Sequence, residues 1–172
     1  MKLNIRETAV FALLGALMYA SKVIMEILPN VHLLGVFVVS ITVAYRKKAL
    51  YPIYIYVFLN GLFSGFSLWW IPYLYIWTLL WGAVMLLPKN IPTKARPIIY
   101  MSVCALHGFL FGTLYAPAQA IMFGLDFKAT IAWIAAGLPW DFVHGVSNFF
   151  CGILICPITS VLKNSEKYIN NR

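Results

Sequence analysis

Residues 139–148 read Pro-Trp-Asp-Phe-Val-His-Gly-Val-Ser-Asn and open the last long apolar segment of the chain. If Pro139 begins a helix, Asp141, His144 and Asn148 fall at positions i, i+3 and i+7 and share one face. Polar groups at membrane depth are costly, so an aligned set of three favours a ligand-binding site. Two structural roles stay open: Asp141 could cap the positive N-terminal end of this helix, and Asn148 could bond a neighbouring helix.

The sequence around this stretch is typical of a polytopic membrane protein. Of its 172 residues, 62% are hydrophobic and 10% are charged, whereas soluble domains carry roughly 25% charged residues. The first apolar run leads directly into further apolar segments and lacks a small-residue cleavage site, so we expect no cleavable signal. Cys104, Cys151 and Cys156 lie inside apolar runs without a CxxC pair. They are therefore expected to be small buried residues rather than disulfides or zinc ligands, and neither a metal nor a cofactor is predicted.

Charge clusters and Pro or Gly breaks divide the chain into six apolar segments. Most of them approach the ~20 residues that a spanning helix needs. The second is short, about 15 residues or ~22 Å, so either its neighbours shield it or it extends into its flanks. The expected fold is an all-α integral membrane protein, a single domain over residues 1–172 with six transmembrane helices in one bundle. The expected spans are residues 8–28, 31–45, 50–66, 68–87, 97–116 and 140–162.

The basic residues predict the orientation of these spans. Of the 13 lysines and arginines, eleven fall before the first segment, after the last, or in alternate connections, all on one side. By the positive-inside rule this side, with both termini, is cytoplasmic. The net charge of +8 is therefore explained by topology, and no nucleic-acid partner is expected. The eleven residues are Lys2, Arg6, Arg46, Lys47, Lys48, Lys89, Lys94, Arg96, Lys163, Lys167 and Arg172.

The outer connection from residue 117 to residue 138 is unusual. From Lys128 to Lys163 there are 36 residues, too many for one span and too few for two spans with a loop. Because Gly137 and Pro139 punctuate this stretch, we expect a short interfacial helix at 127–136 on the outer surface, followed by the sixth span. Such a helix could be a moving lid or a static amphipathic anchor.

Polar and aromatic residues are concentrated in the half of the membrane that this topology places outside. Each has a simpler interpretation: Lys22 and Glu26 could pair with each other, Asn60 could serve helix packing, and the tryptophans could form an interfacial belt. Their segregation to one side instead favours an outward-facing pocket with aromatic walls, suited to a ring-containing metabolite. The candidate substrate-binding residues are Lys22, Glu26, Asn60, Trp69, Trp70, Tyr73, Tyr115, Gln119, Trp140, Asp141, His144 and Asn148. His32, in the first outer turn, is interpreted as a surface histidine.

The first segment carries a stripe of small residues. Ala12, Ala16 and Ala20 recur every four residues, with Gly15 adjacent. In lipid, such a stripe allows another helix to approach closely. It could serve packing within the chain or form the docking face for a partner protein.

Together, the six segments, the alanine stripe, the outer aromatic pocket and the 139–148 sequence resemble the substrate-binding S component of energy-coupling factor (ECF) vitamin transporters. The resemblance implies a bacterial plasma-membrane protein that captures a vitamin-like small molecule from outside. It also implies partners, namely a transmembrane coupling subunit that meets Ala12, Ala16 and Ala20, and two ABC-type ATPases. The chain has no Gly-x-x-x-x-Gly-Lys-Ser/Thr loop, so it is not expected to be an enzyme and ATP hydrolysis would belong to the partners.

The identity of the ligand stays open at this level. Glu26 and Asp141 would suit a cationic ring, whereas Lys22 and His144 would suit a carboxylate or phosphate. Two other functions are also compatible with the sequence. One is a small intramembrane enzyme that uses Asp141 and His144 as an acid/base pair or, with Glu26 and His32, as part of a metal site. The other is a structural membrane subunit.

Overall fold

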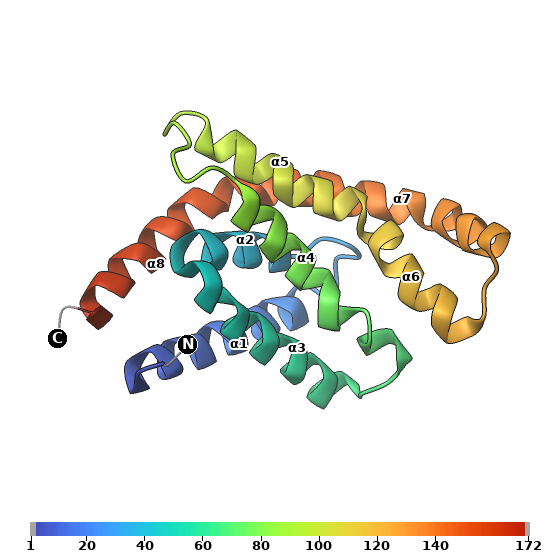
Figure 1. Ribbon diagram of the computed structural model, residues 1–172, viewed down its shortest axis with the longest axis horizontal. Coiled ribbons are helices and arrows are strands. Elements are labelled where there is room, and N and C mark those ends of the chain that lie inside the picture. Colours follow the sequence, from blue (N-terminus) through green and yellow to red (C-terminus); the bar gives the residue numbers. More distant parts are fainter. Residues whose placement is uncertain (1–2, 171–172) are drawn as a thin grey trace.

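The computed structural model describes residues 3–170, of which 167–170 are described by their backbone alone, and the regular structure within this range is entirely helical (Figure 1). The α-helices are α1 (Ile5–Ile24), α2 (Leu34–Tyr45), α3 (Leu50–Ser64), α4 (Tyr73–Leu86), α5 (Arg96–Phe109), α6 (Phe111–Phe123), α7 (Phe127–Cys151) and α8 (Ile155–Asn170). Three short 3₁₀ helices connect some of them, namely η1 (Arg46–Ala49), η2 (Leu68–Trp70) and η3 (Gly152–Leu154).

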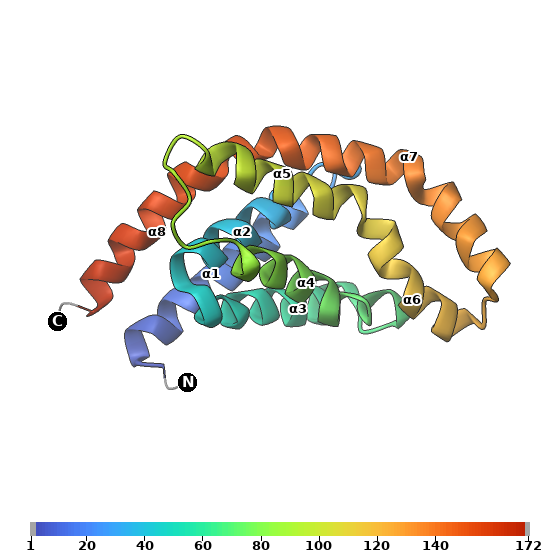
Figure 2. The same cartoon turned by 45° about the horizontal axis from the view of Figure 1, so that its top comes forward.

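Two helix pairs flank a central helix. α1 packs along α3, and α5 packs along α7, while α2 lies between the pairs and contacts α4 and α8 (Figures 1 and 2). The first turn of α1, η1, the α4–α5 connection and α8 lie toward one end of the bundle, and the α6–α7 turn lies at the other (Figure 1). Basic segments that are far apart in the sequence therefore share one end.

Close approach within both flanking pairs depends on glycine. A Cβ on Gly108 of α5 would lie 2.9 Å from the backbone of Gly145 on α7, and a Cβ on Gly15 of α1 would lie 2.4 Å from the Ile55 side chain on α3. Membrane helices associate through such small-residue contacts because lipid provides little hydrophobic driving force between them.

The central helix α2 is short and enclosed. Eleven of its 12 residues are buried, although its length of ~18 Å falls well short of the ~30 Å hydrocarbon core. Hydrogen bonds of 3.3 Å from the Ser40 hydroxyl to the Ile155 carbonyl and from the Tyr45 hydroxyl to the Leu162 carbonyl join it to α8. Of the two expectations for this segment, shielding by neighbours matches the structure.

Four segments of the described chain are long and apolar enough to cross a membrane: Ile5–Ile24, Leu68–Leu86, Arg96–Phe123 and Phe127–Glu166. The all-helical, membrane-compatible character expected from the sequence is thus confirmed in this coarser form. α2 and α3, with 12 and 15 residues, are shorter than a full span. The count of six spans and their orientation stay predictions.

The predicted break at Gly137–Pro139 is wrong, because α7 runs without interruption from Phe127 to Cys151. The separate helix at 127–136 is therefore the first part of α7, and the last segment does not begin at 140. The Asp126 side chain caps this helix by accepting from the Ala129 amide at 2.7 Å. Pro139 removes one amide donor inside the helix, which membrane helices tolerate because local adjustments and neighbouring groups satisfy the freed carbonyl.

The fifth segment also differs from its expected bounds. Residues 97–116 are divided between α5, which ends at Phe109, and α6, which runs to Phe123. The supposed outer connection of 117–138 is consequently helical almost throughout, and only residues 124–126 link α6 to α7. Gly124 ends α6 in the left-handed conformation, with φ of 63°, which glycine adopts without steric cost.

Candidate functional site

A group of aromatic rings surrounds Trp77 of α4, which is 1% exposed. The Trp77 ring centroid lies 5.6 Å from that of His107, 6.0 Å from those of Tyr56, Tyr73 and Phe111, and 6.3 Å from that of His32. The His144 ring extends the group, at 4.6 Å from His32 and 5.0 Å from Phe111. We call these residues the Trp77 cluster; its members are His32, Tyr56, Tyr73, Trp77, His107, Phe111 and His144.

The cluster is assembled from most of the bundle. His32 comes from the α1–α2 connection, Tyr56 from α3, His107 from α5, and His144 from α7, while α4 and α6 supply the remaining rings. Residues from across the sequence therefore meet only when the helices have packed together.

Five polar atoms of the Trp77 cluster are buried and have no hydrogen-bond partner within the described part of the chain. They are His32 Nδ1, Tyr56 Oη, Trp77 Nε1, His107 Nδ1 and His144 Nε2. The other ring nitrogen of His107 is satisfied, because Nε2 lies 3.2 Å from the Ile76 carbonyl oxygen. An unsatisfied buried polar atom costs ~1–3 kcal/mol and is rare in folded proteins. Five of them among contacting rings mark a place where a small molecule could supply the missing partners.

A hydroxyl group on α7 positions the two neighbouring histidines. The Ser147 Oγ atom lies 2.9 Å from the Asn30 carbonyl oxygen and 3.0 Å from the His144 carbonyl oxygen. Asn30 has a φ of 58°, in the left-handed region that asparagine tolerates better than most residues. This contact fixes the turn after α1 against α7 and places His32 beside His144.

Asp141, His144 and Asn148 are all buried, as expected for residues that share one inward face of a helix. Their surroundings differ, however. Both carboxylate oxygens of Asp141 lie 3.0 Å from the Gly112 amide nitrogen, in the first turn of α6. Asp141 therefore caps a helix, as one interpretation held, but it caps α6 rather than its own helix.

Asn148 connects three helices. Its Nδ2 atom donates to the Cys104 carbonyl of α5 at 3.2 Å, and a Cβ on Gly35 of α2 would lie 3.3 Å from the same Nδ2 atom. The side chain is fully buried, and Oδ1 has no partner in the described chain. Bonding to a neighbouring helix, the simpler interpretation of Asn148, is therefore observed.

Two of the predicted aromatic residues, Trp69 of η2 and Tyr115 of α6, continue the Trp77 cluster beyond Tyr73 and Phe111. The Trp69 ring lies 5.6 Å from that of Tyr73, and the Tyr115 hydroxyl donates to the Trp69 carbonyl at 3.0 Å. Tyr115 also lies 6.3 Å from Phe111, measured between ring centroids. Gln119, one turn further along α6, is half-buried.

Two other predicted residues lie in α3 and in η2, just before α4. Asn60 is 1% exposed and lies one turn after Tyr56 on α3, with Oδ1 unpaired within the described residues. Trp70 has a satisfied ring nitrogen, which donates to the Val57 carbonyl at 2.8 Å. Asn60 thus has an unpaired buried polar atom, as members of the Trp77 cluster do. Trp70 instead links η2 to α3 through its hydrogen bond.

Three predicted substrate-binding residues are directed away from the cluster and its neighbours. Lys22 and Glu26 form a 3.0 Å ion pair, and the Glu26 side chain is 64% exposed, so the pairing alternative is the one observed. Trp140 is 59% exposed, because the face of α7 that buries Asp141 turns the preceding residue outward. The structure gives none of these three a place beside the rings.

Sequence reasoning missed Tyr56, Trp77 and His107 and treated His32 as a surface residue. A signal was available, since Trp77 follows Tyr73 by four residues and Asn60 follows Tyr56 by four, so each pair shares a helix face. His107 likewise precedes Phe111 by four residues in its expected segment, but the structure divides that segment between α5 and α6. The contact of His107 with Trp77 and Ile76 becomes apparent only once α5 lies beside α4.

The alanine stripe of α1 is turned away from the bundle. Ala12, Ala16 and Ala20 are all exposed, whereas Gly15 is buried against α3. Packing within this chain, one of the two interpretations of the stripe, therefore uses the glycine and leaves the three alanines free.

The two catalytic arrangements considered from the sequence were an Asp141–His144 acid/base pair and a metal site. Asp141 and His144 share no hydrogen bond in the described chain, and Asp141 is engaged by the α6 backbone. Among the described residues, no three or more His, Cys, Asp and Glu side chains are grouped so that they could hold a metal ion.

No family model, no curated protein and no solved structure matches this chain.

Proposed function

We propose that this chain is the substrate-binding membrane subunit of an ECF-type ABC importer, and that it captures a vitamin-like small molecule in the Trp77 cluster. One observation carries the proposal: five unpaired polar atoms are buried among rings that contact one another. Aromatic walls with a few fixed polar groups are typical of small-molecule sites.

The composition of the cluster narrows the chemistry of the ligand. No member is a carboxylate, lysine or arginine, and the nearest acid along α7, Asp141, is bonded to the α6 backbone. The Trp77 and Tyr56 groups donate hydrogen bonds, while each histidine nitrogen can donate or accept according to its tautomer. A planar, uncharged ring with both donors and acceptors on its edge fits such walls better than a cation or a phosphate does.

The rest of the proposal concerns partners and location. The exposed alanines of α1 provide a flat surface for a transmembrane coupling subunit. Two ABC-type ATPases would drive release, since this chain has no phosphate-binding loop of its own. The shared basic end of the bundle supports a cytoplasmic location for both termini in a bacterial plasma membrane.

The ligand is tested on the purified full chain. Mass spectrometry identifies any small molecule that co-purifies, and thermal unfolding is measured with a panel of water-soluble vitamins. A true ligand at 100 times its dissociation constant adds ~2.7 kcal/mol to the stability. If no compound co-purifies and none raises the unfolding temperature at saturation, ligand capture is wrong.

His144→Ala tests the location of the ligand. Loss of the imidazole should weaken binding at least tenfold, while Trp140→Ala, at an exposed site on the same helix, should leave it unchanged. Equal effects of the two substitutions would place the ligand elsewhere.

Ala16→Leu tests the docking surface. The added side chain projects from an exposed position, so folding and ligand binding should persist, while association with the coupling subunit and uptake are lost. Normal uptake by this variant would contradict the assignment of the alanine stripe.

A further inference from the structure

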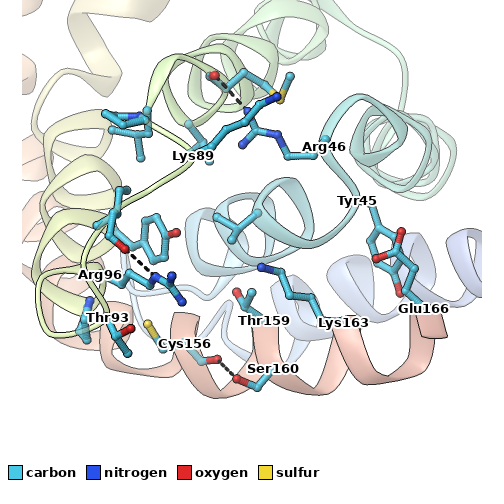
Figure 3. A pocket seen from close by; sticks show the side chains of 18 of the residues that line it. Tyr45, Arg46, Lys89, Thr93, Arg96, Cys156, Thr159, Ser160, Lys163 and Glu166 are labelled. Atoms are coloured by element: carbon cyan, nitrogen blue, oxygen red, sulfur yellow. Dashed lines mark hydrogen bonds between the residues drawn. The ribbon is translucent and has the colours of Figure 1, made fainter. Parts of the chain in front are cut away.

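A cavity lies toward the end of the bundle that carries η1 and the α4–α5 connection. It has a volume of about 890 Å³ and is lined by η1, the α4–α5 connection, the start of α5 and α8. Figure 3 shows its polar side chains. We call it the basic pocket; the residues on which the argument depends are Arg46, Lys89, Arg96, Thr159 and Lys163.

The charge of the pocket is strongly positive. Six basic residues line it, and one of them, Lys48, is engaged by Glu7. Among its described lining residues the only acid is Glu166, which lies beside Tyr45, away from Arg96 (Figure 3). An anion that enters the pocket would meet cations from four separate segments of the chain.

Arg46 is held in place by contacts that a solvated loop arginine would not need. Its φ is 52°, a conformation that costs a non-glycine residue ~1–3 kcal/mol and persists only where the surrounding structure imposes it. The Trp81 ring nitrogen donates to its carbonyl at 3.1 Å, and one terminal nitrogen of its guanidinium donates to the Met85 carbonyl at 3.2 Å. α4 thus orients both the backbone and the side chain of Arg46 toward the pocket.

The opposite wall contains a buried polar group without a partner. Thr159 is 7% exposed, and its hydroxyl has no hydrogen-bond partner in the described chain. The side chains of Arg96, Thr159 and Lys163 point toward a common space between α5 and α8 (Figure 3). Arg96 is itself oriented by a 3.0 Å bond from Nε to the Ile91 carbonyl, which leaves its two terminal nitrogens directed away from that bond.

We propose that the basic pocket binds the phosphate headgroup of an anionic phospholipid. A guanidinium and a phosphate are matched in charge and geometry, and the Thr159 hydroxyl would complete the contact. Basic pockets between membrane helices bind such headgroups in other proteins. This inference does not depend on the proposed function, because the two sites share none of the residues that define them.

The apolar surroundings favour a lipid over a soluble phosphate compound. Val43, Val84, Leu87 and Ile91 line the same cavity as the cations. Three of the helices that border it also expose large apolar side chains next in sequence to lining residues: Leu86 on α4, Ile98 on α5 and Val161 on α8. A headgroup in the pocket could therefore be continuous with acyl chains along these helices, which a free phosphate cannot exploit.

The test uses the full chain in mixed micelles that contain phosphatidylglycerol, phosphatidylcholine or neither, with inorganic phosphate added in a separate arm. Native mass spectrometry counts bound lipid, and titration measures the dissociation constant. Phosphatidylglycerol should bind in preference to phosphatidylcholine, and inorganic phosphate should not compete at the same concentration. If inorganic phosphate saturates the site equally well, or if the two lipids bind alike, the lipid assignment is overturned.

A matched pair of double variants separates the pocket from general surface charge. Arg96→Gln with Lys163→Gln removes two cations from the pocket and should weaken phosphatidylglycerol binding roughly 10- to 30-fold. Lys94→Gln with Lys128→Gln removes two exposed cations outside it and should have no more than a twofold effect. Equal losses in both double variants would contradict a localised site.

Thr159→Val provides a test that does not remove charge. Valine has the shape of threonine and removes only the unpaired hydroxyl, so the protein should remain folded. Binding of phosphatidylglycerol should fall about three- to tenfold if the hydroxyl contacts the headgroup. Unchanged affinity in this variant would exclude that contact and overturn the proposed geometry.

Discussion

The Trp77 cluster and the basic pocket lie in one helical bundle but differ in the chemistry of the side chains that they bring together. The cluster presents rings and uncharged polar atoms, five of them buried without partners in the described chain. The basic pocket presents charged side chains around an open cavity, where most of the charge remains accessible to solvent. Polar atoms without partners are costly in the buried centre of the bundle, whereas unpaired charges at its end stay solvated and cost little.

The strongest test of this comparison is Trp77→Ala. Truncation of a buried tryptophan costs ~3–5 kcal/mol in lost packing and residual cavity, and Trp77 contacts rings from most of the surrounding helices. The free energy of unfolding in detergent is the measurement. Trp140→Ala is the matched control and should change it by less than ~0.5 kcal/mol, since this side chain is mostly exposed. Similar losses for both tryptophans would show that Trp77 is not central to the fold.

Asp141→Ala distinguishes a satisfied buried polar group from the unsatisfied ones. It leaves the Gly112 amide without an acceptor, so unfolding should become easier by ~1–3 kcal/mol. Asp126→Ala is a useful comparison, because it removes the exposed cap of α7 and should cost only ~1 kcal/mol. If Asp141→Ala lost ligand binding but kept its stability, Asp141 would contact the ligand rather than cap α6.

His144→Phe should change the free energy of unfolding in the opposite direction, making the protein more stable. It replaces an unpaired buried imidazole nitrogen with an apolar ring edge, so the stability should rise by ~1 kcal/mol while ligand binding is lost. His107→Phe also removes the contact with the Ile76 carbonyl and should therefore bring no such gain. Chemical denaturation of the two variants side by side measures the difference. A clear loss of stability in His144→Phe would mean that its polar atom is already satisfied in the resting protein.

Lys163→Gln should have the smallest effect on folding. The residue is exposed in the basic pocket, and such substitutions usually change the free energy of unfolding by less than ~0.5 kcal/mol. The free energy of unfolding should be measured at low and at high salt. The difference between this variant and the wild type should stay small at both, because an exposed charge interacts mainly with solvent and counter-ions. A loss above ~1 kcal/mol would show that the pocket charges hold the bundle together, and the contrast with the Trp77 cluster would fail.

Several features of the fold could be read from the sequence because they depend on local pattern. The apolar segments predicted membrane-compatible helices, and the i, i+3, i+7 spacing of Asp141, His144 and Asn148 predicted their shared buried face. The break at Pro139 could not be judged in this way. In water a proline inside a helix costs ~3 kcal/mol, but in a membrane protein the helix is kept because unfolded backbone would cost more.

The composition of the candidate site was harder to predict, because it depends on contacts between distant segments. Trp77 and His107 are ordinary residues of apolar helices until α4 and α5 pack together, 31 residues apart at the Ile76–His107 contact. Trp140 and Glu26 show the converse, because their chemistry favoured a ligand but their side chains are exposed. Residue type indicated what the site is made of, and only the helix packing decided which residues form it.

The enclosure of α2 has a consequence for the order in which the protein is built. A ribosome synthesises this helix second, yet its hydrogen bonds to α8 span 115 and 117 residues of sequence. Before α8 has been synthesised, α2 is covered only in part, by α4 and the other helices that it contacts. Because α2 is itself too short to cross a bilayer, we expect its cover to be completed only when α8 packs against it. A chain that stops before Ile155 would leave the side of α2 that faces α8 exposed.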